Sequence, residues 1–350
     1  FKRHRLAMVS GVVLILFYLI AAFCEFVSPY NPNTRNSRYI QGPPQGVHFF
    51  DKEGDFHLRP FVYGHDVKVE KAEWRRVYKN DPEEKYPVQF FAKGEPYKLW
   101  NLIPMERHLF TVQDAVEGKK GYIHLFGTDK LGRDVFSRIM YGARISLTIG
   151  LIGVFLTFVL GIILGGISGY LGGIADTIIQ RLVEILRCIP QLPLWMALSA
   201  ALPATWSGIK VYMGITVVLS LLAWTGLARV VRGKFLSLRE EDFVVGAALL
   251  GASRGRIIFR HLLPSFMSHI ITAATLAIPG MILGETALSF LGIGLRPPIV
   301  SWGVLLQEAQ NYLTVKMAPW LLLPGLFVVI AVIAFNLLGD GLRDAADPYR

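Results

Sequence analysis

Cysteine is scarce in this sequence, and several motifs that mark enzymes are missing. The 350 residues include two cysteines, Cys24 and Cys188, which lie at or near the ends of apolar runs and give no disulfide framework or metal-binding spacing. No G-x-x-x-x-G-K-S/T phosphate loop, nucleophile elbow or H-E-x-x-H motif occurs. These absences predict a chain that is not an enzyme and that does not hydrolyse ATP through a Walker motif.

Charge is almost absent from long stretches of the chain. Hydrophobic residues make up 53% of the sequence and the mean hydropathy is +0.43, which is more apolar than a typical soluble protein. Several runs of about 17 to 25 residues carry almost no charge, and they have the length that a helix needs to cross a hydrocarbon core. The predicted spans are 6–27, 146–166, 189–202, 211–228, 264–288 and 320–338. The expected fold class is therefore an all-α membrane protein with six transmembrane helices.

The first and third spans depart from the simple pattern. The first has a basic flank, as signal sequences do, but the "EFVSPYNP" that follows lacks a small-x-small cleavage site. It is therefore predicted to be retained. The third is short and contains Pro190 and Pro193.

Basic residues are distributed unevenly among the short loops. Lys2, Arg3 and Arg5 precede the first span, and a dense cluster of arginines lies between the fourth and fifth spans. The loops near 203–210 and 289–319 hold few basic residues. The positive-inside rule then places both termini in the cytoplasm. The net charge of +10 reflects this bias, so no nucleic-acid partner is expected.

This orientation divides the chain into three parts. Residues 1–27 form the cytoplasmic N-terminus and first span, and 28–143 form an extracytoplasmic insert that ends in an amphipathic elbow helix. Residues 144–350 form a membrane core with five spans. Aromatic, proline and glycine residues in runs such as "HFFDKEGDFHLRPFVYG" predict a few small strands and turns in the insert. We expect these strands to make a small compact cap.

The run "VVGAALLGASRGRIIFRHLLPS", 244–265, combines small residues with a cationic side. As a single helix it would place Ala247 and Gly251 in one row, and Gly246, Leu250 and Arg254 in a neighbouring row. Arg256 and Arg260 would form a separate basic row. Pro264 would end this helix and open the next. An interfacial helix whose arginines meet lipid phosphates explains the pattern equally well.

The same run resembles the signature loop of ABC importer permeases, E-A-A-x-x-x-G followed at fixed spacing by L-P. Gly246, Ala247 and Gly251 hold the small positions, and Leu263 and Pro264 hold the end. Val245 stands where the family has its acidic residue. The resemblance implies a coupling helix, about 240–262, that docks into a groove of an ATPase subunit.

Three further stretches resemble the dipeptide, oligopeptide and nickel branch of that family, and specifically its second, "C"-type permease. They are "FGTDKLGRDVFSRIMYGARISLTIGL" at 126–151, "ETALSFLGIGLRPPIVSWGVLLQEA" at 285–309 and "LLGDGLRDAADP" at 337–348. The resemblance implies an ABC importer type I permease fold. The insert, about 38–120, lies outside the common pattern.

The first of these stretches is predicted to be an outer elbow motif. Thr128 or Asp129 is expected to cap a short amphipathic helix, and Arg133, Arg138 and Arg144 are expected at the headgroup level. An interfacial elbow with no role in substrate binding is the plainer explanation. The motif residues are Gly127, Thr128, Asp129, Gly132, Arg133 and Asp134.

A few residues inside the fifth span are candidates for the pathway or a gate. Glu285 is an acid at membrane depth, which is a functional candidate by default, although a structural bond to the following loop explains it as well. Pro279 and Gly280 predict a kink, which serves either gating or packing. His261 and His269 are eight residues apart with no third ligand near them, so no metal site is predicted.

The resemblance implies a transmembrane permease subunit of an ATP-driven importer for peptides or similar small solutes in the bacterial inner membrane. It implies a second permease, two ABC ATPases that hold ATP and Mg²⁺, and an external substrate-binding protein. It implies no cofactor in this chain, and the remaining contacts are with membrane lipid. A gradient-driven secondary transporter would show paired broken helices in inverted repeats, and a sensor would carry a cytoplasmic signalling domain. Neither pattern is clear in the sequence.

Overall fold

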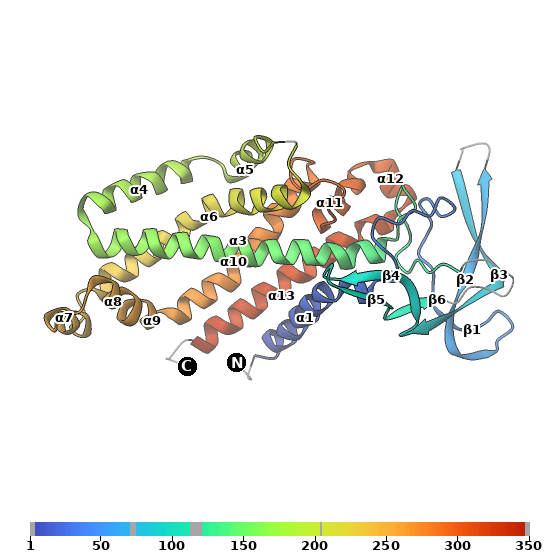
Figure 1. Ribbon diagram of the computed structural model, residues 1–350, viewed down its shortest axis with the longest axis horizontal. Helices are drawn as coiled ribbons and strands as arrows, with labels where there is room; N and C mark the ends of the chain where they lie inside the picture. The colour runs from blue at the N-terminus through green and yellow to red at the C-terminus, as the bar shows by residue number, and fades with distance from the viewer. Residues whose placement is uncertain (1–3, 71–74, 113–120, 204, 347–350) are drawn as a thin grey trace. The chain divides into compact units, whose positions relative to one another are not determined.

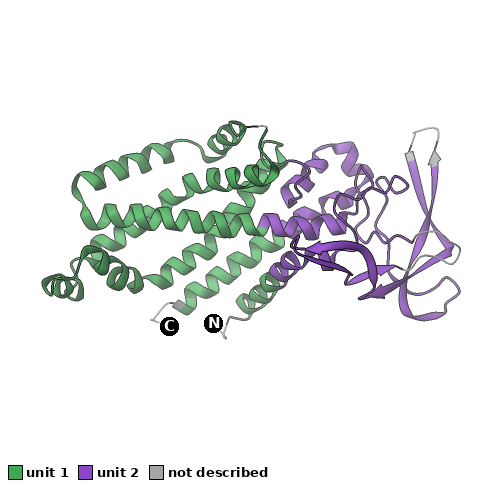
Figure 2. Ribbon diagram, in the orientation of Figure 1, with its two compact units in different colours: residues 1–15, 147–295, 329–350 green, residues 16–146, 296–328 purple. Residues whose placement is uncertain are grey.

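The computed structural model describes residues 4–70, 75–112, 121–203 and 205–346. Lys2 and Arg3, used above for orientation, lie outside the described residues, as do Asp347 and Pro348 of the last motif. The chain divides into two compact units (Figure 2). The first holds residues 1–15, 147–295 and 329–350, and the second holds 16–146 and 296–328. Helices α1 (Arg5–Ala22), α3 (Val135–Leu171) and α13 (Leu323–Ala346) contribute residues to both.

Among the described residues, five helical segments are long and apolar enough to cross a membrane. They are Arg5–Ala22, Val135–Leu171, Gly208–Leu238 (α6), Met267–Phe290 (α10) and Pro319–Ala345, which joins η3 (Pro319–Leu322) to α13. A sixth span exists only if α4 (Gly173–Cys188) and α5 (Gln191–Ala200), which meet at 91°, count as one (Figure 1). The helical membrane fold is therefore confirmed, with five or six spans.

The third predicted span, 189–202, is wrong as a single crossing. Helix α5 has 10 residues, or about 15 Å of rise, and the hydrocarbon core is about 30 Å thick. Ile189 is extended because a residue before proline avoids helical backbone angles. Pro190 then serves as the N-cap of α5, and this dipeptide produces the bend.

The basic segment between α6 and α10 is a chain of short elements rather than one helix. It comprises α7 (Asp242–Leu249), α8 (Arg254–Ile257), the π-helical turn η1 (Ile258–Leu262) and α9 (Leu263–Ser265). The π turn ends two residues before Pro264, a residue that lacks an N–H and whose ring clashes with the carbonyl four residues earlier in a regular helix. The break into α10 comes at Phe266, whose φ is −127°, and not at Pro264 as predicted.

The second unit contains two antiparallel β-structures. Strands β1 (His48–Phe50), β2 (Phe56–Glu70), β3 (Arg75–Phe90) and β6 (Phe110–Val112) form a sheet in the order β1-β2-β3-β6, and β4 (Lys93–Leu99) pairs with β5 (Ile103–Arg107). The strands β2 and β3 are longer than the small strands expected. The same unit holds the short helices α2 (Cys24–Val27), α11 (Trp302–Gln307), η2 (Glu308–Gln310) and α12 (Tyr312–Met317).

A bulge lets the long hairpin β2–β3 continue past a proline. Tyr63 pairs with Lys85 but the next residue, Gly64, pairs with Asp81, so β3 carries extra residues that include Pro82. A Cβ on Gly64 would lie 2.5 Å from the Glu84 carboxylate. The core beneath the sheet consists of Val62, Tyr86, Val88, Phe110, Val112 and Ile123.

His65 makes the stability of this sheet depend on pH. Its side chain is 3% exposed, and its Nδ1 lies 3.3 Å from Nε2 of Gln45. Burial, and then the neighbouring His124, lower the pKa of His65 from 6.5 to about 4. Because the folded pKa lies below the unfolded one, this contribution to stability is complete above pH 6.5 and is lost as the pH falls towards 4.

We therefore expect hydrogen exchange in β2 to accelerate, after correction for the intrinsic pH effect, between about pH 7.5 and about pH 5. The variant His65→Phe keeps a buried ring but cannot titrate, so its corrected exchange should change less with pH. Equal pH profiles in the two proteins would show that His65 is not the titrating group.

Candidate functional site

The basic segment is anchored on α6 and α10 by a buried apolar cluster. Phe235 of α6 and Phe266 contact edge to face, with ring centroids 5.8 Å apart. Val244, Ile257 and Leu262 are 3%, 2% and 0% exposed and belong to the same cluster. Close-packed interiors transmit displacement rather than absorb it. A force on this segment therefore reaches α6 and α10 directly.

Helix α7 ends in a Schellman motif centred on Gly251. The N–H of Gly251 donates to the Ala248 carbonyl at 3.0 Å, and the N–H of Ala252 donates to the Ala247 carbonyl at 3.1 Å. Gly251 has φ +78°, in the left-handed region that favours glycine. The prediction that Ala247 and Gly251 share one helical row is therefore wrong, because α7 ends before Gly251. Ser253 caps α8 by accepting from the Arg256 N–H at 3.3 Å.

The outward surface of the segment is apolar at its turn and basic beyond it. Leu249 and Leu250 are 84% and 91% exposed. Ala247 packs inward against the buried cluster, whereas a Cβ on Gly246 or Gly251 would meet no described atom within 4 Å. The exposed basic residues of the segment are Arg254, Arg256 and Arg260.

Leu249 is 84% exposed but was not among the predicted docking residues, and Ala247, which was among them, packs against the buried cluster. Reading Gly251 as a helix stop would have identified the last turn, and with it the exposed Leu249–Leu250 pair. We name the exposed surface of Leu249, Leu250, Arg254, Arg256 and Arg260 the coupling surface.

The Schellman motif predicts which substitutions of Gly251 preserve transport and which do not. Asparagine enters the left-handed region more readily than β-branched residues do, so Gly251→Asn should keep most of the transport activity. Gly251→Val should distort the turn, at a cost of about 1 kcal/mol or more, and should reduce transport strongly. Uptake assays at equal membrane abundance compare the two. Equal loss in both variants would indicate that bulk at this position matters more than backbone conformation.

A cavity of about 430 Å³ lies among α3, α5, α6 and α10. Within the part of the chain that the structure describes, two buried polar atoms of its wall have no hydrogen-bond partner, Oγ1 of Thr157 and Nε1 of Trp195. Gly226 of α6 and Gly280 of α10 face it, and a Cβ on either would meet no described atom within 4 Å. Apolar walls with a few polar groups are typical of small-molecule sites.

The three candidate gate residues of the fifth span have different surroundings. Helix α10 is continuous through Pro279, which is buried, and Gly280 lines the cavity. Glu285 is 0% exposed and accepts a hydrogen bond from Ser289 Oγ at 2.8 Å. Ser289 Oγ in turn accepts from the Leu295 N–H at 3.0 Å. These bonds favour the structural explanation of Glu285, as a bond to the loop after α10.

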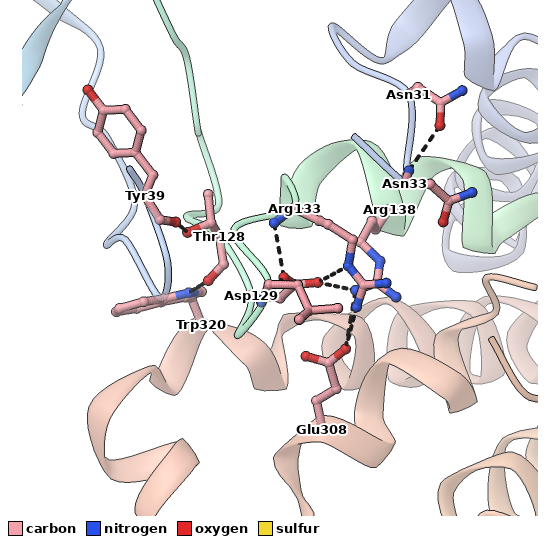
Figure 3. A network of polar contacts seen from close by, with 10 residues as sticks. Asn31, Asn33, Tyr39, Thr128, Asp129, Arg133, Arg138, Glu308 and Trp320 are labelled. Carbon is pink, nitrogen blue, oxygen red and sulfur yellow. Dashed lines mark hydrogen bonds and ion pairs between the residues drawn. The ribbon is translucent and has the colours of Figure 1, made fainter. Parts of the chain in front are cut away.

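Asp129 and Arg133 of the outer motif belong to a buried charge cluster near the start of α3 (Figure 3). Asp129 accepts from the N–H groups of Leu131 and Arg133 at 2.8 and 3.0 Å and from Arg133 Nε at 2.7 Å, and it also pairs with Arg138. Glu308 accepts from Arg133 Nη2 at 2.9 Å and from Arg138 Nη1 at 3.2 Å. Arg133 and Arg138 are 7% and 1% exposed, so both side chains are buried within the protein. Their place at the headgroup level stays a prediction.

The helix cap is also a different residue from the one predicted. Asp134 accepts from the Ser137 N–H at 2.7 Å and so caps α3. Thr128 instead bonds Tyr39 and Gly42, and its carbonyl accepts from Trp320 Nε1 at 3.0 Å. No separate elbow helix occurs between 121 and 203, because α3 begins at Val135 and continues to Leu171.

Two glycines of the outer motif permit close backbone approach. Gly127 and Gly132 have φ +71° and +72°. A Cβ on Gly132 would overlap the Asn36 carbonyl, and one on Gly127 would lie 2.6 Å from the Gly42 carbonyl. The outer motif therefore packs closely against segments that are distant in the sequence, around residues 36–42 and 308–320.

Removing one partner of a buried ion pair leaves an uncompensated charge, which costs about 3–5 kcal/mol. We therefore expect Asp129→Ala to lower the stability of the purified chain strongly. Glu184→Ala is the control, because Glu184 forms an exposed pair with Arg181 at 2.8 Å, and such pairs contribute about 0–1 kcal/mol. Thermal unfolding in detergent should separate the two. If Asp129→Ala lowered the thermal stability no more than Glu184→Ala does, the cluster would not stabilise the fold.

Residues 139–349 match the family described as binding-protein-dependent transport system inner membrane component, and residues 1–44 match the N-terminal TM domain of oligopeptide transport permease C. The oligopeptide transport system permease protein OppC of Haemophilus influenzae is 40% identical over 68% of this chain and 74% of its own length. The dipeptide transport system permease protein DppC of Bacillus subtilis is 42% identical over 64% and 68%.

A solved structure of the MetNI methionine ABC transporter in an inward-facing conformation aligns with 61% of this chain and 98% of its own, at 20% identity and a TM-score of 0.47. The apolar helices and the family match together define a multi-pass membrane protein of a transport system. The chain belongs to the family of binding-protein-dependent transport system inner membrane components. The resemblance to the "C"-type permeases of the peptide branch is thereby confirmed.

Proposed function

We propose that this chain forms one half of the translocation pathway of an importer for peptides or similar small solutes, driven by partner ATPases. The relatives named above are permease proteins of oligopeptide and dipeptide transport systems, which supports this class of solute. The proposed partners are a second permease, two ABC ATPases that would hold ATP and Mg²⁺, and an external binding protein. The rigidly anchored coupling surface is the single observation that carries the proposal.

The coupling surface suits a groove on a partner protein. Leu249 and Leu250 extend from the last turn of α7 with almost their whole side chains exposed. Apolar anchors surrounded by arginines are typical of interface centres. When the ATPases close on ATP, a partner holding these leucines would displace the buried cluster, and α6 and α10 would move as rigid bodies.

The 430 Å³ cavity is the proposed solute-facing part of the pathway in this chain. Its position against α6 and α10 means that the helices moved by the coupling surface also form its walls. Nε1 of Trp195 and Oγ1 of Thr157 belong to residues of the cavity wall and have no partner among the described residues. Both atoms are covered by protein, so we infer that they bind a solute carbonyl once the walls move. Peptide backbones offer such carbonyls at every residue.

Uptake by membrane vesicles tests the proposed energy source. Vesicles containing the whole importer and its binding protein should accumulate labelled peptide when ATP is supplied on the side of the coupling surface, even after an ionophore has collapsed all ion gradients. Uptake that stops with the ionophore and persists without ATP would support a gradient-driven secondary transporter instead.

A further inference from the structure

Trp100 lies at the tip of the hairpin β4–β5 in a backbone conformation that bulky residues rarely adopt. Trp100 and Asn101 have φ +55° and +58°, the pattern of a type I′ turn, and the Leu102 N–H donates to the Leu99 carbonyl at 3.0 Å. Asparagine suits such a turn, but tryptophan is strained in it. Strain of this kind persists where surrounding contacts impose it and often marks a functional position.

The contacts that hold Trp100 lie at the C-terminal end of α1. Its indole Nε1 donates to the Ala22 carbonyl at 3.0 Å, and its backbone N–H donates to Glu25 Oε1 at 3.3 Å. The Arg144 guanidinium lies 4.9 Å from the centre of the indole ring. Arg144 also donates to the carbonyls of Ala21 and Ala22 at 2.8 and 3.0 Å. Together they satisfy carbonyls that a helix end leaves without partners.

This anchoring fixes the height of the hairpin tip relative to the bilayer. Helix α1 has 18 residues and is about 27 Å long, close to the thickness of a hydrocarbon core of about 30 Å. Ala22 therefore lies at the boundary between hydrocarbon and headgroups. The indole bonded to it lies at the level where tryptophan is enriched in membrane proteins.

The tip exposes apolar side chains at that level. Leu102 is 80% exposed, and Trp100 and Ile103 are each 57% exposed. Leu19, in the outer half of α1, and Phe23, which directly follows α1, are 51% and 46% exposed, and α1 is apolar enough to cross a membrane. The hairpin tip therefore continues an apolar surface that already lies in the bilayer.

We propose that the tip of hairpin β4–β5, with Leu102 and Ile103 at its end, inserts into the interfacial region of the lipid leaflet next to α1. Trp100 is the positioning residue that holds the tip at this depth. The insert is then attached to the membrane at a second place besides the helices. This proposal does not depend on the transported solute or on the ATPases.

The test uses the whole complex in phosphatidylcholine nanodiscs. A Cys188→Ser background removes the exposed native thiol, and Cys24 is buried. An environment-sensitive fluorophore is attached at Leu102→Cys or, as a matched control, at Leu58→Cys, since Leu58 is 86% exposed on β2. We expect the Leu102 probe to be quenched by brominated acyl chains and shielded from iodide, and the Leu58 probe to show the reverse.

Two other outcomes would overturn the proposal. A Leu102 probe that iodide quenches as readily as the Leu58 probe would place the tip in water. A Leu102 probe shielded from both quenchers would show that a protein partner, such as the second permease, covers the tip.

A variant of Trp100 tests the positioning role separately. Trp100→Gly keeps a residue that favours the left-handed backbone but removes the indole. We expect it to reduce lipid quenching at Leu102 while the control probe at Leu58 stays unchanged. Undiminished lipid quenching would show that Trp100 does not set the depth of the tip.

Discussion

Replacing Leu250 with aspartate is expected to abolish ATP-driven uptake while the chain remains inserted in the membrane. Leu250 is 91% exposed and follows the last residue of α7, so a polar side chain there should leave the fold intact. If the leucine fills a groove of an ATPase, removing it costs about 2 kcal/mol or more of binding energy. That corresponds to about thirtyfold weaker association, and a buried aspartate adds the cost of desolvating its charge.

A control variant distinguishes a loss of ATPase binding from a loss of the folded structure. Leu58→Asp introduces the same charge at a leucine of similar exposure, 86%, in the insert, and should transport normally. The Leu250→Asp variant should reach normal membrane abundance but should lose ATPase subunits during purification. Normal uptake with Leu250→Asp would show that the coupling surface is not needed for transport.

Filling the cavity from α6 is expected to block transport without destabilising the chain. Gly226→Phe adds a ring where a Cβ meets no described atom within 4 Å. Replacing glycine within a helix also stabilises it by up to about 1 kcal/mol. Thermal stability should therefore stay the same or rise, while uptake of every peptide should fall towards background because the ring occupies the solute-facing space.

Two controls make this prediction specific to the cavity. Gly226→Ala should keep most uptake of peptides with small side chains and lose more for peptides with bulky ones. Gly233→Phe adds the same ring to α6 at another glycine with open space, one that does not line the cavity. Equal inhibition by the phenylalanines at 226 and 233 would show that bulk on α6, rather than the cavity, determines transport.

Hydropathy located five of the helices that are long and apolar enough to cross a membrane, but not the third predicted span or the true ends of the helices. The predicted fourth span, 211–228, stops where Arg229, Arg232 and Lys234 begin, yet α6 continues to Leu238. A helix can leave the bilayer and remain helical in water, so charge marks the membrane boundary and not the helix end. The proline pair at 190 and 193 was noticed in the sequence, but the angle of 91° between α4 and α5 could not be predicted from it.

The local chemistry of the outer motif could be predicted better than its partners. An acid near the start of a helix was expected, and Asp134 fulfils that role where Thr128 or Asp129 was proposed. Glu308 could not be assigned to the cluster, because it is far from Arg133 and Arg138 in the sequence and no local pattern links them. Without that partner, the buried ion-pair cluster of the two arginines could not be predicted.

In the insert, too, contacts between residues far apart in the sequence could not be predicted. Its aromatic and proline runs indicated strands, but the bulge that lets β2 and β3 extend past Pro82 depends on pairing with Gly64 across the hairpin. The contact between Trp100 and the end of α1 links residues 78 positions apart. Both arise from tertiary structure that no short window of sequence contains.

Affinity purification of a tagged copy from native membranes in mild detergent, followed by mass spectrometry, tests the central proposal most directly. The account predicts a second permease and one or two Walker-motif ATPases in the purified complex, and it predicts that Leu250→Asp loses the ATPases but keeps the permease. A chain that is recovered alone and still transports after reconstitution without ATP would contradict it.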